Sequence, residues 1–319
     1  MNVAVCSRRL AAMLCAVVAG LVCLTGAAPP VSIRIATGLP GMTFKPLGEA
    51  LVDALGRRLS DMRFSVVETA GSVTNLQLLQ EGRGELGLAL ADVSYMAYNG
   101  RIPEFKEPAR NIRGVAVLHP SVVHVLVPSD SPARSVSDLR GDIGVGAPGS
   151  GTTVTAGLLL QAFGVPPERV RQRALPFVDG SDAVTRHQLQ AAFVVAADPV
   201  DAVERATRAG ARLLGVSGPD VLRLREEYPF LRPAVIPPGT YPGELRAVHT
   251  LLVDVLLVSR ADLDERVVRR LTATLFEVLP GLSSSNAFLR LIDLERVPAT
   301  PIPLHPGAAL YYREQELLR

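Results

Sequence analysis

A glycine-rich stretch at residues 144–153 holds the side chains and amides best suited to chemistry. It reads Gly-Val-Gly-Ala-Pro-Gly-Ser-Gly-Thr-Thr and leaves a predicted strand to open a predicted helix. The first amides of a helix lack intrahelical acceptors and lie at the positive end of its dipole. With the hydroxyls of Ser150 and Thr152, they predict an uncharged cradle for an anion. The alternative is an ordinary turn, because Ser and Thr commonly cap helices.

Nucleotide-binding motifs match this stretch only in part. A P-loop needs a lysine where Thr152 stands. Gly144-x-Gly146-x-x-Gly149 has dinucleotide-binding spacing, but the acid at about the right distance, Glu168, lies in a proline-rich turn. An uncharged cradle suits a carboxylate better than a triphosphate, so no nucleotide is expected.

Two further strand-to-helix junctions resemble this one. Ala36–Gly41 ends the first predicted strand, and Thr69–Asn75 follows the second, with Ser72 predicted as a helix N-cap. The carboxyl ends of parallel strands share one edge of a sheet, where open α/β folds bind ligands. We therefore expect the three junctions to converge.

Catalytic and metal-binding patterns are scarce. The 5 histidines show no paired ligand spacing, so neither a metal nor a cofactor is expected. Ser150 lies between glycines, but Pro148 stands where a nucleophile elbow needs its first glycine. An exported hydrolase using Ser150 would need a base that the sequence does not supply. The sequence predicts no enzyme.

The N-terminus has the order of a secretory signal. Arg8 and Arg9 precede an apolar run at Leu10–Leu24 and then small residues, which predicts a signal peptide at residues 1–27 and a periplasmic protein. The run is shorter than the roughly 20 residues of a membrane span, although an uncleaved anchor is the alternative. All 3 cysteines lie in this segment, and its removal leaves 31 basic and 31 acidic residues. Nothing in this balance favours a nucleic-acid partner.

The rest of the chain alternates predicted strands with amphipathic helices, in two series joined by extended apolar runs. This pattern predicts an α/β fold with two lobes of the type II periplasmic-binding-protein kind, each a mostly parallel sheet flanked by helices. Residues 28–121 with 250–319 are expected to form lobe one, and residues 122–249 lobe two. Hinge strands are expected at Val122–Val127 and Leu251–Val258. The alternative is one larger doubly wound domain.

Element boundaries follow from hydrophobic periodicity and from glycine and proline punctuation. The predicted strands are Ser32–Thr37, Arg63–Glu68, Glu85–Leu90, Ile112–Leu118, Val122–Val127, Asp142–Gly146, Val170–Leu175, Gln190–Ala196, Ala211–Val216 and Thr250–Ser259. The predicted helices start near Phe44, Ser72 and Asp92 and then span Thr152–Phe163, Ser181–Gln188, Pro199–Ala209, Asp262–Leu279, Asn286–Glu295 and Ala308–Leu317. Tyr228–Gly243, rich in Pro and Gly, is expected to be a loop.

Several short motifs resemble, in the same order, those of the TAXI-type receptors that serve TRAP transporters. They are Ile35–Gly41 with Pro46-Leu47-Gly48, Thr69–Leu76, Glu85–Asp92, Gly146–Thr152, Ala192–Val195, Ile236–Gly243, Pro303–Ala308 and Tyr311–Glu314. The resemblance implies a two-lobed receptor that delivers a carboxylate-bearing solute, such as an amino acid or a dicarboxylate, to TRAP-type membrane subunits. A periplasmic sensor without a transporter is the alternative.

The resemblance also implies a set of ligand-binding residues around a cleft. By position these are Thr37, Gly38, Ser72, Asn75, Asp92, Ser150, Gly151, Thr152 and Phe193. We expect Thr37, Ser72 and Asn75 from lobe one and Ser150–Thr152 from lobe two to close on the ligand. A ligand shifts the equilibrium between the open and closed forms only through contacts that differ between the two forms.

Overall fold

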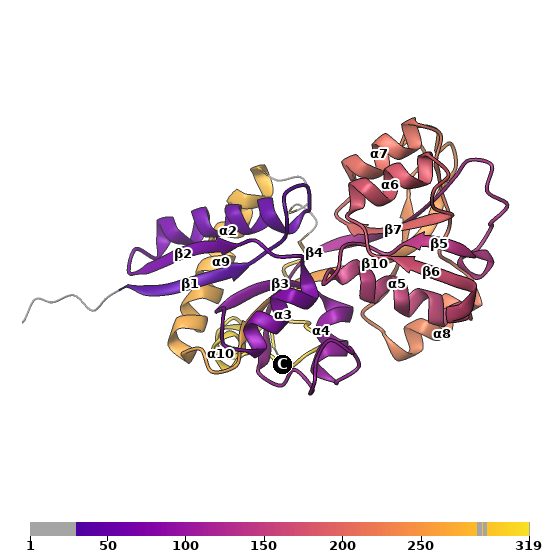
Figure 1. Cartoon of the computed structure of the whole chain (residues 1–319). Coiled ribbons are helices and arrows are strands. Elements are labelled where there is room, and N and C mark those ends of the chain that lie inside the picture. Colours follow the sequence, from indigo (N-terminus) through magenta and orange to yellow (C-terminus); the bar gives the residue numbers. More distant parts are fainter. Residues whose placement is uncertain (1–29, 286–288, 290–291, 319) are drawn as a thin grey trace, which may run out of the picture.

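A computed structural model describes residues 30–285, 289 and 292–318 and shows two lobes built on one 10-stranded sheet (Figure 1). The predicted signal at residues 1–27 and all cysteines lie outside the described residues. Half of the predicted helix at Asn286–Glu295 also lies outside them, and its described end, residues 292–295, is not helical. No helix in the described part of the chain is long and apolar enough to cross a membrane.

Lobe one contains three parallel strands in the order β2-β1-β3, with helices on both sides (Figure 1). Its first elements are β1 (Val31–Ala36), α2 (Phe44–Arg58), β2 (Met62–Val67), α3 (Ser72–Gln80), β3 (Leu86–Leu90) and α4 (Ala91–Tyr98). Leu47, Leu51 and Leu55 recur at helical spacing along α2 and are buried, so hydrophobic burial fixes this helix against the sheet.

Lobe two repeats the arrangement with strands in the order β7-β5-β6, again parallel to one another. Its elements are η2 (Val136–Asp138), β5 (Gly141–Gly144), α5 (Gly151–Ala162), η3 (Pro167–Arg169), β6 (Val170–Arg173), α6 (Phe177–Thr185), β7 (Ala191–Ala196), α7 (Asp201–Arg208), β8 (Arg212–Leu213), α8 (Pro219–Glu227) and β9 (Arg232–Ile236). Helices α6 and α7 lie on one face of this lobe, and α5 and α8 on the other (Figure 1).

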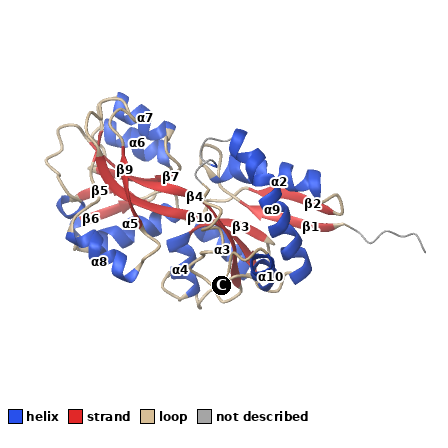
Figure 2. Ribbon diagram, turned by 180° about the vertical axis from the view of Figure 1, so that it is seen from behind, coloured by secondary structure: helices blue, strands red, loops and turns tan. Residues whose placement is uncertain are grey.

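Two long antiparallel strands, β4 (Ile112–Val127) and β10 (Val248–Arg260), run through both lobes (Figure 2). In lobe one β10 pairs with β3, and in lobe two β4 pairs with β7. Helices α9 (Glu265–Ser285) and α10 (Pro306–Glu314) then return to lobe one. The predicted two-lobed fold with hinge strands is therefore confirmed, while the boundaries at residues 121/122 and 249/250 stay predictions.

The crossing strands are irregular at their centre. Pro120 of β4 faces Asp254 of β10, and the register shifts between Asp254 and Leu256. Proline has no N–H for the ladder, and a bulge bends a strand locally. Strand pairing is therefore weakest where the chain passes from one lobe to the other, as a hinge requires.

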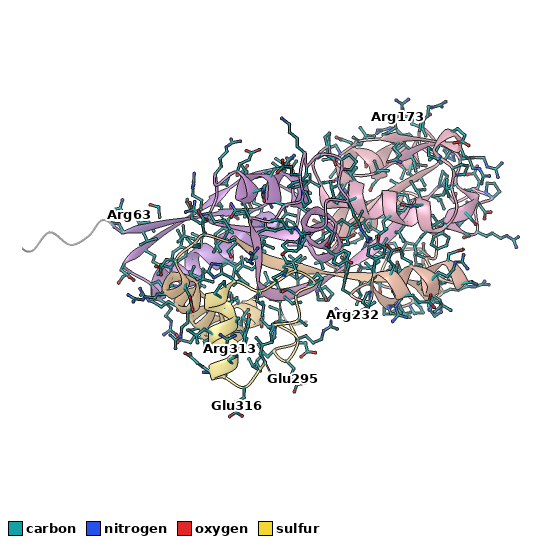
Figure 3. All side chains as sticks on the ribbon, turned by 90° about the horizontal axis from the view of Figure 1, so that it is seen from below. Arg63, Arg173, Arg232, Glu295, Arg313 and Glu316 are labelled. Carbon is teal, nitrogen blue, oxygen red and sulfur yellow. The ribbon has the colours of Figure 1, made fainter. Side chains whose placement is uncertain are left out.

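The Asp254 carboxylate joins the two lobes beside this irregularity. It accepts hydrogen bonds from Arg232 of β9 at 2.5 Å and from Arg296, which follows α9, at 3.1 Å. Figure 3 shows Arg232 near the junction of the lobes. The Asp254 side chain is only 5% exposed, so one buried charge is balanced by an arginine from each lobe.

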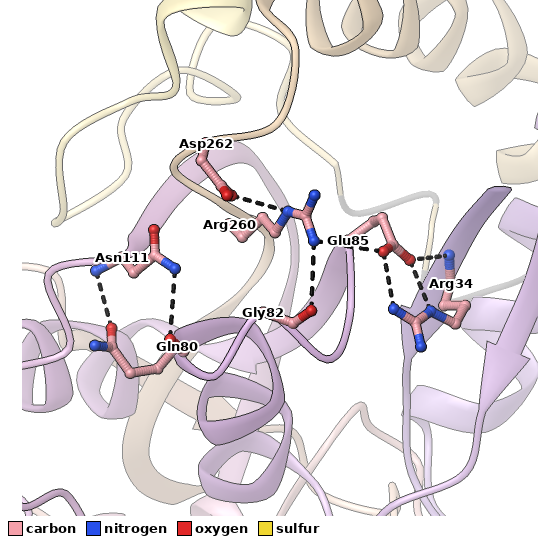
Figure 4. Close-up of polar contacts among 7 residues, drawn as sticks. All are labelled: Arg34, Gln80, Gly82, Glu85, Asn111, Arg260 and Asp262. Carbon is pink, nitrogen blue, oxygen red and sulfur yellow. Dashed lines mark hydrogen bonds and ion pairs between the residues drawn. The ribbon is translucent and has the colours of Figure 1, made fainter. Parts of the chain in front are cut away.

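A second ion-pair network ties the strands of lobe one together away from the hinge (Figure 4). Glu85 accepts from the backbone and guanidinium of Arg34 at 2.9 Å, and Arg260 lies 3.7 Å away. Arg260 also pairs with Asp262 at 2.9 Å. These contacts hold the ends of β1, β3 and β10 in register.

Three local expectations are wrong. The two runs at Ile112–Leu118 and Val122–Val127 form the single strand β4, and the loop expected at Tyr228–Gly243 contains β9. Helix α6 begins at Phe177 instead of Ser181, because Gly180 interrupts the apolar pattern without interrupting the helix. This last difference matters for the site.

Candidate ligand site between the lobes

A cavity lies between the two lobes, at the carboxyl ends of the strands. Lobe one contributes Met42, Thr43, Phe44, Gly71, Ser72 and Leu90, strand β4 contributes Ser121, and lobe two contributes Gly151, Thr152, Phe177 and Val195. The cavity is partly open to solvent, and its free volume of about 20 Å³ is room for roughly one water molecule. The lobes thus leave only a small space between them, and none of the described residues that line it carries a charged side chain.

Helix starts supply most of this lining. Phe44 begins α2, Ser72 begins α3, Gly151 begins α5 and Phe177 begins α6. First-turn amides have no acceptor inside their own helix. The predicted convergence of strand-to-helix junctions therefore holds, and it includes a fourth junction, at Phe177, that the sequence did not reveal.

Hydroxyl groups face the cavity from three sides. Ser72 Oγ accepts from the Leu90 N–H at 3.0 Å and keeps its own hydrogen to donate. Thr152 and Ser121 are 2% and 1% exposed, and their hydroxyls have no hydrogen-bond partner among the described residues. Neither hydroxyl is among the fully buried polar atoms that lack a partner, so both open onto the cavity and are available to a ligand.

The lobes also bond directly to each other beside the cavity. The amides of Val73 and Thr74, at the start of α3, donate to the Gly149 carbonyl of lobe two at 3.1 and 3.2 Å. Thr155 of α5 donates to Asp92 of α4 at 2.6 Å. A carbonyl of the protein therefore occupies the anion-binding position expected at the start of α3. The first residues of α5, by contrast, line the cavity.

A polar and aromatic contact joins the lobes on the side of α4 and α8. Arg101 lies 2.7 Å from Glu227 and 3.1 Å from the Tyr228 hydroxyl. Tyr95 packs against Tyr228 and Phe230 with ring centroids 5.9 and 5.2 Å apart. The closed arrangement is thus stabilised by many contacts between protein groups.

The structure brings three of the predicted ligand residues, Ser72, Gly151 and Thr152, to the cavity lining. Ser72 is not the N-cap of α3, however. Gly71 takes that position, with φ 122°, where glycine has the least steric cost. The Ser72 hydroxyl is instead bonded to the next strand of the sheet.

Thr37 and Asn75 lie in the framework behind the cavity. The Asn75 amide donates to the carbonyls of Thr37 and Leu88 at 2.7 Å each and accepts from Thr69 at 2.5 Å. Thr37 Oγ1 donates to the Val67 carbonyl. These polar groups join β1, β2 and β3, so in this closed form none is free for a ligand.

Three other predicted residues lie beside the cavity without lining it. Gly38 lies under Phe44, with only 3.1 Å between the Phe44 Cβ and the place of a Cβ on Gly38. Ser150 is fully buried, and its hydroxyl has one hydrogen-bonding neighbour in the described chain, Thr153 Oγ1 at 3.3 Å. Phe193, 1% exposed on β7, belongs to the hydrophobic core.

Asp92 is fully buried at the start of α4. Burial raises the pKa of its carboxyl to about 6 from the ordinary 3.8, although hydrogen bonds from Thr155 and Val93 oppose the rise. A protonated Asp92 could donate to Thr155, which could then donate to the Gly151 carbonyl, 3.2 Å away. Asp92 thus links the lobes and does not reach the cavity.

Because folding raises this pKa, the favourable contribution of Asp92 to the free energy of unfolding is complete below about pH 4. This contribution is lost as the pH rises through about 6. One pKa unit corresponds to about 1.4 kcal/mol. Asp92→Asn, which carries no charge at any pH, is expected to stabilise the protein at pH 8 by on the order of 2 kcal/mol and to change little at pH 4. Urea unfolding at both pH values measures this. A variant carrying Asp92→Asn that is less stable at pH 8 than the natural protein would contradict it.

A buried polar cluster supports the lobe-two wall. The Tyr241 hydroxyl donates to Asp198 at 2.6 Å, accepts from the Val200 N–H at 3.0 Å and lies 2.9 Å from His124 Nε2. His124 lies on β4 and Asp198 just after β7, so the cluster anchors the loop after β9. No sequence pattern indicated it, because its members lie far apart along the chain. No group of three or more His, Cys, Asp or Glu suited to a metal ion occurs among the described residues.

The model of the NMT1-like family matches residues 35–315 of the chain. The protein belongs to the NMT1-like family. Its fold is similar to the alkanesulfonate-binding protein SsuA from Xanthomonas axonopodis pv. citri bound to MOPS, at 18% identity over 92% of this chain and 86% of that one, with a TM-score of 0.51. An ATP-bound protein of Xanthomonas citri has a TM-score of 0.54, at 13% identity over 90% and 99%. An ancestral arginine-binding protein bound to arginine has 0.50, at 15% over 83% and 100%.

At these identities the similarity shows the fold alone, which is the two-lobed fold of solute-binding proteins. The family match of this NMT1-like protein overturns the predicted membership of the TAXI-type receptors. The motifs that suggested it are mostly glycine, serine and threonine turns at helix starts, which this fold needs for steric and capping reasons. The TRAP partner rested on that resemblance and is withdrawn with it.

Proposed function

We propose that this NMT1-like protein is the extracytoplasmic solute-binding component of an ABC-type importer and that its interlobe cavity binds a small organic anion, a carboxylate or a sulfonate. The single observation that carries the proposal is the cavity itself. Hydroxyl-bearing and helix-start residues of both lobes, and Ser121 of a strand shared between them, line one partly open space, and no described residue of this lining carries a charged side chain. Helix-start amides favour negative groups.

The comparisons support the class of function. SsuA, whose fold this chain shares, is named an alkanesulfonate-binding protein. The arginine-bound ancestral protein of the same fold is likewise named for the small molecule that it binds. The signal peptide predicted at residues 1–27 is consistent with a function outside the cytoplasm. A site of this kind binds and releases its ligand unchanged, so no catalytic step is proposed.

Ligand binding can be tested by thermal unfolding and calorimetry with short alkanesulfonates, short carboxylic acids, dicarboxylates and amino acids. A ligand at 100 times its dissociation constant is expected to stabilise the protein by about 2.7 kcal/mol. Binding should also weaken when Thr152 is changed to valine, which keeps the shape and removes the hydroxyl. The outcome against the proposal is that no compound in any of these classes shifts the unfolding temperature.

A further inference from the structure

Ser121, like Thr152, lines the cavity with a hydroxyl that makes no hydrogen bond to the described residues. It lies on β4, the strand shared by both lobes, directly after Pro120, where the pairing with β10 is irregular. It is 1% exposed, lines the cavity and has no hydrogen-bond partner among the described residues. The Ser121 hydroxyl is not among the fully buried polar atoms that lack a partner, so it opens onto the cavity, and this position points to a ligand atom.

The other lining groups restrict what that ligand can be. Ser72, Ser121 and Thr152 bring hydroxyls from lobe one, the crossing strand and lobe two, whereas Leu90, Phe177 and Val195 make the remaining surface apolar. No acidic side chain of the described residues lines the cavity. An ammonium group buried there would lose its water without gaining a carboxylate, which is strongly unfavourable.

We propose that Ser121 is a ligand-binding residue at the pivot of the two lobes and that the ligand is a short aliphatic monoanion without an ammonium group. This inference rests on the proposed function and narrows it. The lobes must lie further apart than in this structure to admit such an anion, because the cavity described here has room for about one water molecule. The compact oxyanion then accepts hydrogen bonds from Ser121 and Thr152, and the short hydrocarbon body packs against the apolar wall. The amino acids and dicarboxylates expected from the sequence are then excluded, since each adds a second charge.

Because of its position, Ser121 plays a different role in ligand binding from Thr152. Strand β4 belongs to both lobes, so the Ser121 hydroxyl stays at the floor of the site whether the lobes are open or closed. Thr152 moves with lobe two. Ser121 therefore binds the ligand first, and residues at the helix starts add their contacts when the lobes close.

Two matched ligand pairs test the ligand class in calorimetry with the natural protein. Ethanesulfonate is compared with 2-aminoethanesulfonate, and propionate with 3-aminopropionate, so each pair differs by one ammonium group. The unsubstituted anion of at least one pair is expected to bind at least tenfold more tightly than its amino analogue. The pairs also show whether a sulfonate or a carboxylate is preferred.

Ser121→Ala tests the residue, and Ser259→Ala is its control. Ser259 is a buried serine of the other crossing strand whose hydroxyl also lacks a partner among the described residues, but it does not line the cavity. Ser121→Ala is expected to weaken binding of the preferred anion about tenfold, and Ser259→Ala to leave it unchanged. Thermal unfolding of both variants confirms that they fold.

The outcomes separate this inference from the function on which it rests. If amino analogues bind as tightly as the simple anions, or Ser121→Ala binds normally, the inference fails while the receptor function stands. If the natural protein binds neither these four compounds nor any solute of a wider set, the proposed function itself fails. The ligand pairs need no variant, so they decide the ligand class even if Ser121→Ala does not fold.

Discussion

Replacing Gly151 with alanine is expected to hold the two lobes apart. A Cβ at this first residue of α5 would lie 2.6 Å from Ser72 Oγ and 2.7 Å from Leu90 Cδ1, both in lobe one. Carbon atoms do not approach neighbours this closely, and overpacking of this kind costs about 1–3 kcal/mol. The collision exists only in the closed form, so nearly all of this energy opposes the closure of the lobes. Because about 1.4 kcal/mol is a factor of ten, closure and ligand affinity should fall about tenfold.

Small-angle X-ray scattering measures the lobe separation directly, and the radius of gyration should rise. Gly157→Ala is the matched control in the same helix, since a Cβ there meets nothing within 4 Å. Alanine in a helix interior is more favourable than glycine by about 0.5–1 kcal/mol, so this control should be slightly stabilised and bind normally. An unchanged radius of gyration and affinity in Gly151→Ala would show that the lobes do not meet as described.

Replacing Asp254 with asparagine is expected to be the most destabilising single charge change in the described chain. Its carboxylate is 5% exposed and lies between Arg232 and Arg296. Removing one partner of a buried ion pair leaves charge uncompensated, with losses of about 3–5 kcal/mol. The two arginines keep side-chain exposures of 31% and 36%, so we expect the lower end, about 3 kcal/mol.

Calorimetric or circular-dichroism melting measures this loss as a fall in the unfolding temperature of about 6–12 °C. Asp142→Asn is the control because Asp142 also pairs with two arginines, Arg171 and Arg173, whose side chains are 72% and 56% exposed. Exposed pairs contribute about 0–1 kcal/mol, so this variant should melt nearly as the natural protein does. Equal effects of the two changes would mean that the Asp254 pair is no more stabilising than a surface contact.

Local patterns predicted most of the fold. Alternating apolar strands and amphipathic helices led to the two-lobed architecture, and turn residues located the starts of α3 and α5. Proline and glycine misled where tertiary packing overrides local preference. Two strands were expected on either side of Pro120, yet pairing with the neighbouring β10 and β7 makes β4 one continuous strand. Gly180 similarly hid the first turn of α6 and, with it, Phe177.

The site was less predictable, because neighbours in space decide which polar residue is free. The Asn75 side chain belongs to a serine- and asparagine-bearing turn like those that bind ligands, but carbonyls of Thr37 and Leu88 take its hydrogens. Ser121 follows a proline inside an apolar strand and carried no signal at all. Only packing shows that its hydroxyl lacks a partner among the described residues, whereas the Asn75 amide has three.

The two crossing strands also set the order in which the chain can assemble during synthesis. Strand β3 completes its pairing only with Val255–Ser259 of β10, far later in the chain, whereas β5, β6 and β7 of lobe two pair within a short span. Contacts distant in sequence form slowly, and a nascent chain emerges from its N-terminus. The β3 edge in the half that is translated first therefore stays unpaired until the later half has been made, and during this interval a chaperone could bind the exposed edge.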